Sequence, residues 1–110
     1  MSAPSSTTLD PARWRVAATP LARMRGLLGR PPLAAGDGLL LRRCAGVHTC
    51  FMRAPIDVVF LSGDGDVLHV VPRLRPWHAV CRRGAHAVLE LPPGTCAAAG
   101  IRPGDRLELP

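Results

Sequence analysis

Short apolar runs alternate with turn-forming residues along most of this chain. Glycine, proline and aspartate separate the runs, and several of the runs are rich in valine and leucine. Short apolar segments bounded by such residues are typical of β-strands. The pattern predicts seven strands: Trp14–Thr19, Leu39–Leu41, Val47–Met52, Ile56–Leu61, Val67–Val71, Ala85–Leu91 and Arg106–Leu109.

Turn residues indicate how some of these strands are connected. Asp64–Gly65 stands between two of the runs and predicts a tight hairpin turn. A calcium-binding loop is the alternative for this stretch, but the remaining ligands of such a loop are missing. Pro103–Gly104 has the residue order of a type II turn. Arg73–Trp77 is expected to be extended, because a residue that precedes proline avoids the helical conformation.

Two short helices are predicted beside the strands. The first begins at Thr19–Pro20, since a hydroxyl N-cap followed by proline is typical of a helix start. Gly29 ends it. The second is Thr95–Ala99, which Gly100 closes. The fold class is therefore mainly β with two short helices, either a compact antiparallel β-barrel or a jelly-roll-like sandwich.

The length and apolar content favour one domain with a real core. The chain has 110 residues, of which 47% are hydrophobic. We expect residues 1–12 to form a disordered lead-in and residues 13–110 to form the domain. No apolar run is long enough for a membrane span, and the first residues lack the features of a signal peptide. The expected location is the cytoplasm, and we expect a monomer.

The chain is strongly basic, with a net charge of +6, and all 14 of its basic residues are arginine. The absence of lysine excludes Schiff-base chemistry and the lysine-bearing phosphate loop. A basic surface is also the usual footprint of nucleic-acid binding, but the sequence shows no helix-turn-helix pattern, no zinc-finger spacing and no tyrosine. Arginine-mediated nucleic-acid binding therefore stays an alternative, and a soluble, solvated surface is preferred.

The cysteines offer a second alternative. They are Cys44, Cys50, Cys81 and Cys96, and no two have the spacing of a redox or zinc-ribbon pair. We expect reduced thiols that pack as small apolar side chains, with no metal and no cofactor. Cys44, His48 and Cys50 could instead converge with Cys81 on a metal ion, or with Asp57 in a thiol enzyme.

Two acidic residues stand inside apolar strands. Asp57 lies in Ile56–Leu61, and Glu90 lies between two leucines. A buried charge without a partner is strongly disfavoured, so we expect an arginine partner or loop N–H groups for each. Arg23, on the first predicted helix, is the expected partner of Asp57. Acid–base catalysis by the two carboxyls is the alternative.

Several ordered motifs resemble the family called domain of unknown function 192. They are Arg23–Leu28, His48–Thr49, Met52, Pro55–Leu61, Pro76–Trp77, Val88–Leu91 with Gly94, and Gly100–Ile101 with Gly104–Asp105. The resemblance spans residues 17–107. It implies a compact, mainly β domain of jelly-roll-like character with short helices. The biochemical role of the family is not established.

The sequence favours a non-enzymatic binding or accessory domain for a small polar or anionic ligand or a peptide. Loops carry binding groups more often than the framework does, and the chain reversal near Pro55 is polar and sulfur-rich. We predict that His48, Met52, Arg53 and Trp77 border a shallow pocket. Arg53 would orient an anionic or polar group, and Trp77 would supply an apolar wall. No catalytic residue is assigned.

Overall fold

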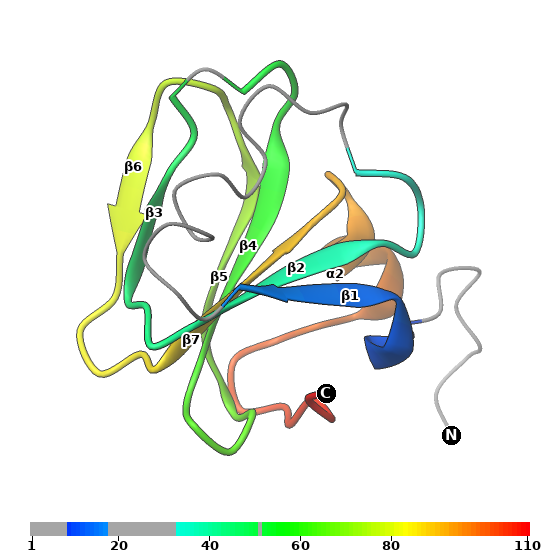
Figure 1. Cartoon of the computed structure of the whole chain (residues 1–110), viewed down its shortest axis with the longest axis vertical. Helices are drawn as coiled ribbons and strands as arrows, with labels where there is room; N and C mark the ends of the chain where they lie inside the picture. The colour runs from blue at the N-terminus through cyan, green and yellow to red at the C-terminus, as the bar shows by residue number, and fades with distance from the viewer. Residues whose placement is uncertain (1–8, 18–32, 51) are drawn as a thin grey trace.

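Two β-sheets form the framework of the protein (Figure 1). The structure is a computed structural model that describes residues 9–17, 33–50 and 52–110. Its elements, in chain order, are η1 (Pro11–Arg13), β1 (Trp14–Ala17), β2 (Gly38–Arg42), β3 (Gly46–His48), β4 (Ile56–Leu61), β5 (Val67–Leu74), β6 (Ala79–Cys81), β7 (Ala87–Leu91) and α2 (Thr95–Ala99).

The larger sheet has five strands in the order β1-β2-β7-β4-β5, and the smaller one pairs β3 with β6. Only the β1–β2 pair is parallel among these strands. The predicted mainly β, sandwich-like fold is confirmed, and the strands of the described residues do not close into a barrel. The helix predicted to begin at Thr19 lies outside the described residues.

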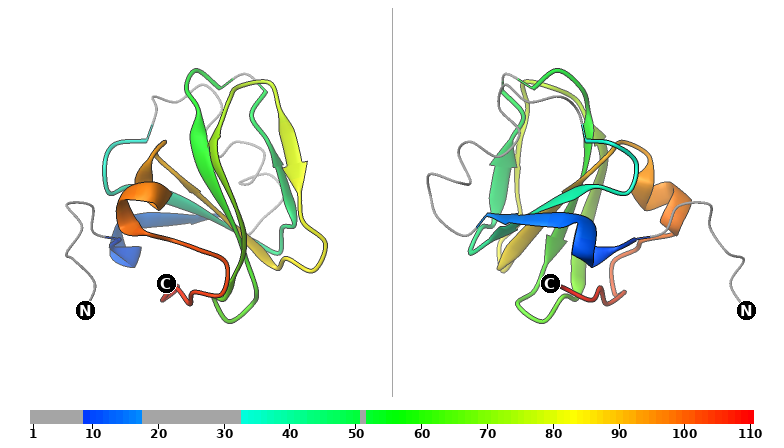
Figure 2. Two further views of the ribbon diagram at one scale, coloured as in Figure 1. Left: turned by 180° about the vertical axis from the view of Figure 1, so that it is seen from behind. Right: turned by 45° about the vertical axis from the view of Figure 1, so that its right-hand side comes forward.

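The five-stranded sheet buries side chains on both of its faces. All residues of β4 and β7 are buried, so these two strands form the centre of the molecule. One face carries a core cluster that includes Leu40, Val59 and Leu89, and α2 covers it through Cys96. The other face carries a second cluster, against which Val47 of β3 and Val80 of β6 pack. The sheet is thus sandwiched between α2 and the β3–β6 pair, as Figure 2 shows.

Three predicted segments differ from the structure. The strand predicted over Val47–Met52 is shorter, because β3 ends at His48 and the chain then turns. The strand predicted over Arg106–Leu109 is wrong, since only an isolated bridge joins Arg106 to Asp66. Arg73–Trp77 is not uniformly extended, because Arg73 and Trp77 have positive φ angles of 49° and 66°.

Two further differences concern the strands after the hairpin. β5 continues past Val71 to Leu74, through Pro72. Proline cannot donate to a ladder, but β5 is an edge strand, where such a residue is tolerated. β6 was not predicted, because its three residues are too few to give a pattern.

The predicted turns are confirmed. Ser62 N donates to Asp66 O at 2.9 Å, and Gly65 takes a φ of +95° within the hairpin. The N–H of Asp105 donates to the carbonyl oxygen of Arg102 at 3.1 Å, and Gly104 supplies the positive φ of a type II turn.

Asp57 of β4 is completely buried and accepts hydrogen bonds from three backbone N–H groups. Its Oδ1 accepts from Arg73 N at 2.8 Å and from Gly94 N at 3.2 Å, and its Oδ2 accepts from Cys96 N at 2.8 Å. One carboxylate therefore joins the end of β5 and the first turn of α2 to the central strand. Loop N–H groups were one of the two partners expected for it. Arg23, the other, lies outside the described residues.

We expect Asp57→Ala to destabilise the fold by about 3–5 kcal/mol, because it leaves three N–H groups without their shared acceptor in a buried place. Urea denaturation measures this free energy of unfolding. Asp64→Ala is the control, since Asp64 is exposed in the hairpin turn, and it should change stability by less than about 0.5 kcal/mol. Equal unfolding midpoints for the two variants would contradict the role given to Asp57.

Candidate functional site

Two loops meet beyond the Ile56 end of β4, and Thr49 holds them together. Thr49 is completely buried. Its Oγ1 donates to Arg75 O at 2.6 Å and accepts from His78 N at 2.9 Å. Its backbone N–H donates to His78 O at 2.8 Å, while its carbonyl accepts from Trp77 N at 3.0 Å and Met52 N at 3.2 Å. The turn after β5 is therefore fixed on the loop after β3.

Trp77 stands at the tip of this junction with an unusual conformation. Its side chain is 62% exposed, although tryptophan is usually largely buried. Its backbone has a φ of +66°, a left-handed conformation that few residues other than glycine adopt. Such strain persists only where the surroundings impose it. The hydrogen bonds of Thr49 impose it here, so the indole ring is held toward solvent.

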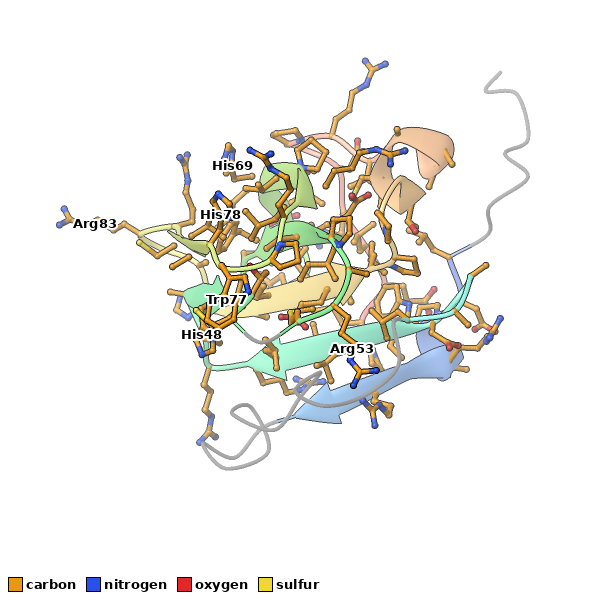
Figure 3. All side chains as sticks on the ribbon, turned by 90° about the horizontal axis from the view of Figure 1, so that it is seen from above. His48, Arg53, His69, Trp77, His78 and Arg83 are labelled. Atoms are coloured by element: carbon orange, nitrogen blue, oxygen red, sulfur yellow. The ribbon has the colours of Figure 1, made fainter. Side chains whose placement is uncertain are left out.

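Polar and basic side chains lie on the same two loops as this ring. His48 is exposed and directly precedes Thr49, while His78 directly follows Trp77. The Nδ1 atom of His78 lies 2.9 Å from the carbonyl oxygen of Pro76. Arg53 is exposed on the other loop. In Figure 3, seen from above, Arg53 and Trp77 both lie on the end of the molecule that faces the viewer.

Met52 differs from the other three residues predicted for this site. It is half-buried and packs against the core cluster that contains Val58 and Phe60. Its side chain therefore anchors the loop to the sheet, and the exposed part of the candidate site consists of His48, Arg53 and Trp77.

Sequence reasoning did not single out Thr49 as the organiser of this junction. Its partners stand 26 and 29 residues further along the chain, so no local pattern could indicate them. The one available signal was its place in the His48–Thr49 motif that resembles the family.

Glu90 lies buried on the face of the sheet that carries Val58 and Val88. Its exposed fraction is 4%, and it pairs across the sheet with Leu39 and with Val58. Within residues 9–17, 33–50 and 52–110, no hydrogen bond or ion pair to its carboxyl is found. Burial raises the pKa of Glu90 to about 7, so the carboxyl changes charge near neutral pH.

The sheet separates two residues of the alternative thiol site, Asp57 and Cys44. Asp57 alternates with Val59 and points to the face covered by α2, whereas Cys44 packs on the opposite face. Cys44 Sγ lies 2.8 Å from Gly46 O. Among the residues that the structure describes, no group of three or more histidine, cysteine or acidic side chains could hold a metal ion.

Cys96 is the one cysteine beside the Asp57 carboxylate. Burial, and after it the charge of Asp57 and a hydrogen bond to it, raises the pKa of the Cys96 thiol to about 12. A thiol that stays protonated at neutral pH is a poor nucleophile. We therefore assign Cys96 to packing under α2.

The described residues contain no helix that is long and apolar enough to cross a membrane.

Comparisons with known proteins point to one family. The family model DUF192, described as "Uncharacterized ACR", matches residues 3–109. The UPF0127 protein PF1050 of Pyrococcus furiosus is 39% identical over 90 residues, which cover 78% of this chain and 77% of that protein.

Two solved structures share the fold. A protein of unknown function from Novosphingobium aromaticivorans has a TM-score of 0.80 and 28% identity, with 87% of this chain and 74% of that chain covered. A protein from Sinorhizobium meliloti, described as a "putative transcription regulator", has a TM-score of 0.80 and 29% identity, with 86% of this chain and 79% of that chain covered.

The pKa of Glu90 is 4.5 in its ordinary state and about 7 in the folded chain. We therefore expect the free energy of unfolding to fall as the pH rises through this window. In this window the folded chain binds more protons than the unfolded chain, so a rising pH favours unfolding, by about 3 kcal/mol in all. Glu90→Gln removes this loss. Melting temperatures at pH 5 and pH 8 should therefore differ less in the variant, and an unchanged difference would contradict the ionisation of Glu90.

Proposed function

We propose that this chain, which belongs to the DUF192 family, is a binding domain that holds a small polar or anionic ligand against Trp77. His48 and Arg53 border the ligand, and Thr49 positions the two loops that carry these groups. No catalytic step is assigned to these residues.

The observation that carries the proposal is the exposed, strained Trp77. An exposed indole gives up the stabilisation of burial, and a left-handed backbone at a residue other than glycine costs about 1–3 kcal/mol. A glycine at this position would avoid both costs. Six hydrogen bonds of Thr49 within these loops hold the Trp77 backbone in place before any ligand arrives. Such preorganisation lowers the entropic cost of binding.

The charge around Trp77 favours a ligand that is anionic or rich in acceptors. The loops over residues 49–55 and 75–78 contain Arg53 and Arg75 and no acidic residue. Both arginines are exposed, and a guanidinium recognises carboxylate or phosphate through paired hydrogen bonds. An indole face adds a flat apolar surface for a ring. Together they suit a small ring-bearing anion, of which sugar phosphates and aromatic carboxylates are examples.

Tryptophan fluorescence gives a direct test. The protein has two tryptophans, and Trp14 is 6% exposed while Trp77 is 62% exposed. A thermal-shift screen of sugar phosphates, nucleotides and aromatic carboxylates selects compounds that stabilise the fold. We expect these compounds to change the emission of Trp77, and Trp77→Ala to weaken their binding at least about tenfold.

Two further variants separate binding from folding. Arg53→Gln should weaken the same compounds, whereas Arg102→Gln, which removes an equal charge from the exposed turn after α2, should not. Thr49→Val keeps the shape of the side chain but loses the hydroxyl, so it should loosen the loops and weaken binding while Trp77 remains. Full affinity in Trp77→Ala would refute the proposal.

Arginine-mediated nucleic-acid binding is the second candidate. The Sinorhizobium meliloti protein with the same fold bears a name that points to transcription, and the net charge of this chain is +6. The described helix has only five residues, too short to serve as a recognition helix in a groove. Fluorescence anisotropy with a labelled duplex and a labelled single strand, repeated across salt concentrations, tests this candidate. Absence of binding at low salt would remove it.

A further inference from the structure

A cavity of about 720 Å³ lies at the Leu61 end of β4. Arg42 and Arg43 line it from the end of β2, Gly63 from the β4–β5 hairpin, and Ala87 from the start of β7. The Trp77 loops lie at the opposite end of β4, a strand of six residues, so about 17 Å separates the two regions. In Figure 1 the hairpin is at the bottom, away from the loops that join β5 to β6.

The polar part of the cavity wall is cationic or neutral. Arg42, Arg43 and His86 line the cavity, and its described lining contains no acidic residue. Arg42 Nη2 donates to the main-chain oxygen of Pro110. For the exposed side chain of Arg43, no hydrogen bond or ion pair is found in the part of the chain that the structure describes.

The backbone has distinctive geometry at Arg43 and at His86. Arg43 has a φ of +54°, a left-handed conformation at a residue other than glycine. The N–H of His86 donates to Leu61 O at 2.9 Å, and the carbonyl of His86 accepts from Cys44 N at 3.4 Å. The backbone of His86 is thus held on both sides, by Leu61 and by Cys44.

The remainder of the lining is largely apolar. Ala85, Ala87 and Leu109 contribute to it. Ala87 belongs to the core cluster beneath α2, and Leu109 packs against that cluster. Small-molecule sites typically have volumes of about 300–1,000 Å³, with an apolar wall and a few polar groups that fix the orientation of the ligand.

From this combination we infer that the cavity is a binding site for a small amphiphilic anion. A carboxylate or phosphate head lies between Arg43 and His86, and a short apolar body packs on Ala85, Ala87 and Leu109. The site is separate from the Trp77 loops, so this inference does not rest on the function proposed above.

Hexanoate and hexyl phosphate are suitable probes, because each joins an anionic head to a short apolar body. Titration followed by ¹H–¹⁵N correlation spectra of the full chain locates their binding. We expect saturable shifts at the amides of Cys44, Gly63 and Ala85, with Kd of about 1 mM or tighter. Acetate lacks the body and hexanol lacks the charge, so each should bind at least about tenfold more weakly than hexanoate. The tighter of the two hexyl probes identifies the preferred head group.

Two variants test the assignment from different sides. Arg43→Gln removes a charge and should weaken hexanoate at least about tenfold. Gly63→Phe fills the cavity mouth, and it should be tolerated, because a Cβ at Gly63 meets no atom within 4 Å. Arg102→Gln, with the same charge change in the exposed turn after α2, is the control and should bind hexanoate like the parent chain.

The melting temperature of each variant shows that it folds. Shifts that do not saturate, that cluster at Trp77, or that persist unchanged in both Arg43→Gln and Gly63→Phe would overturn the inference.

Discussion

The buried carboxylate of Asp57 is the interaction on which the arrangement of this fold depends. β5 ends and α2 begins at places where backbone N–H groups have no strand or helix partner, and the one side chain of Asp57 accepts from both places. These N–H groups satisfy both oxygens of the side chain, so the polar group can lie inside the core without an unmet hydrogen bond. Gly94 suits this geometry for two reasons. Its φ is +89°, which favours glycine, and a Cβ there would stand 3.0 Å from the Arg73 guanidinium.

Thr49 joins the outer loops through side-chain hydrogen bonds to backbone groups, as Asp57 does at the edge of the sheet. Both side chains are fully buried, and both bond to backbone groups of segments far along the chain. The two differ in consequence. Asp57 joins a helix to a strand inside the core, whereas Thr49 joins two surface loops and so sets the position of an exposed ring. A buried polar side chain that satisfies backbone groups can therefore specify a surface as firmly as it specifies a core.

The sequence predicted an element best where a local pattern with clear boundary residues determines it. β4 was predicted with the bounds that the structure has, because a continuous apolar run ends at Pro55 on one side and at Ser62–Gly63 on the other. α2 was predicted for the same reason, between Gly94 and Gly100.

The strand predicted over Arg106–Leu109 was wrong because tertiary contacts decide the conformation of this segment. Leu107 and Leu109 pack on the core beside the hairpin, and Leu107 N donates to Gly65 O, so the last segment follows the hairpin without forming a strand. Of the candidate site, the exposed Trp77 and Arg53 were named from the sequence. The hydrogen bonds of Thr49 and the cavity between Arg43 and His86 join residues too distant along the chain for any local pattern to connect them.

Among the residues that the structure describes, three other than glycine have a positive φ, and they show how the framework concentrates strain. Arg43, Arg73 and Trp77 each follow closely after the end or bulged part of a strand. The N–H groups of Arg73 and Trp77 donate to Asp57 and Thr49, which offsets the cost of their backbone conformation. Each keeps a large side chain where glycine would be less strained. At Arg73 the guanidinium lies over Gly94, and at Trp77 the ring faces solvent. The exposed ring of Trp77 lies on the same loops as His48 and Arg53, so we interpret its strain as part of a surface shaped for a ligand.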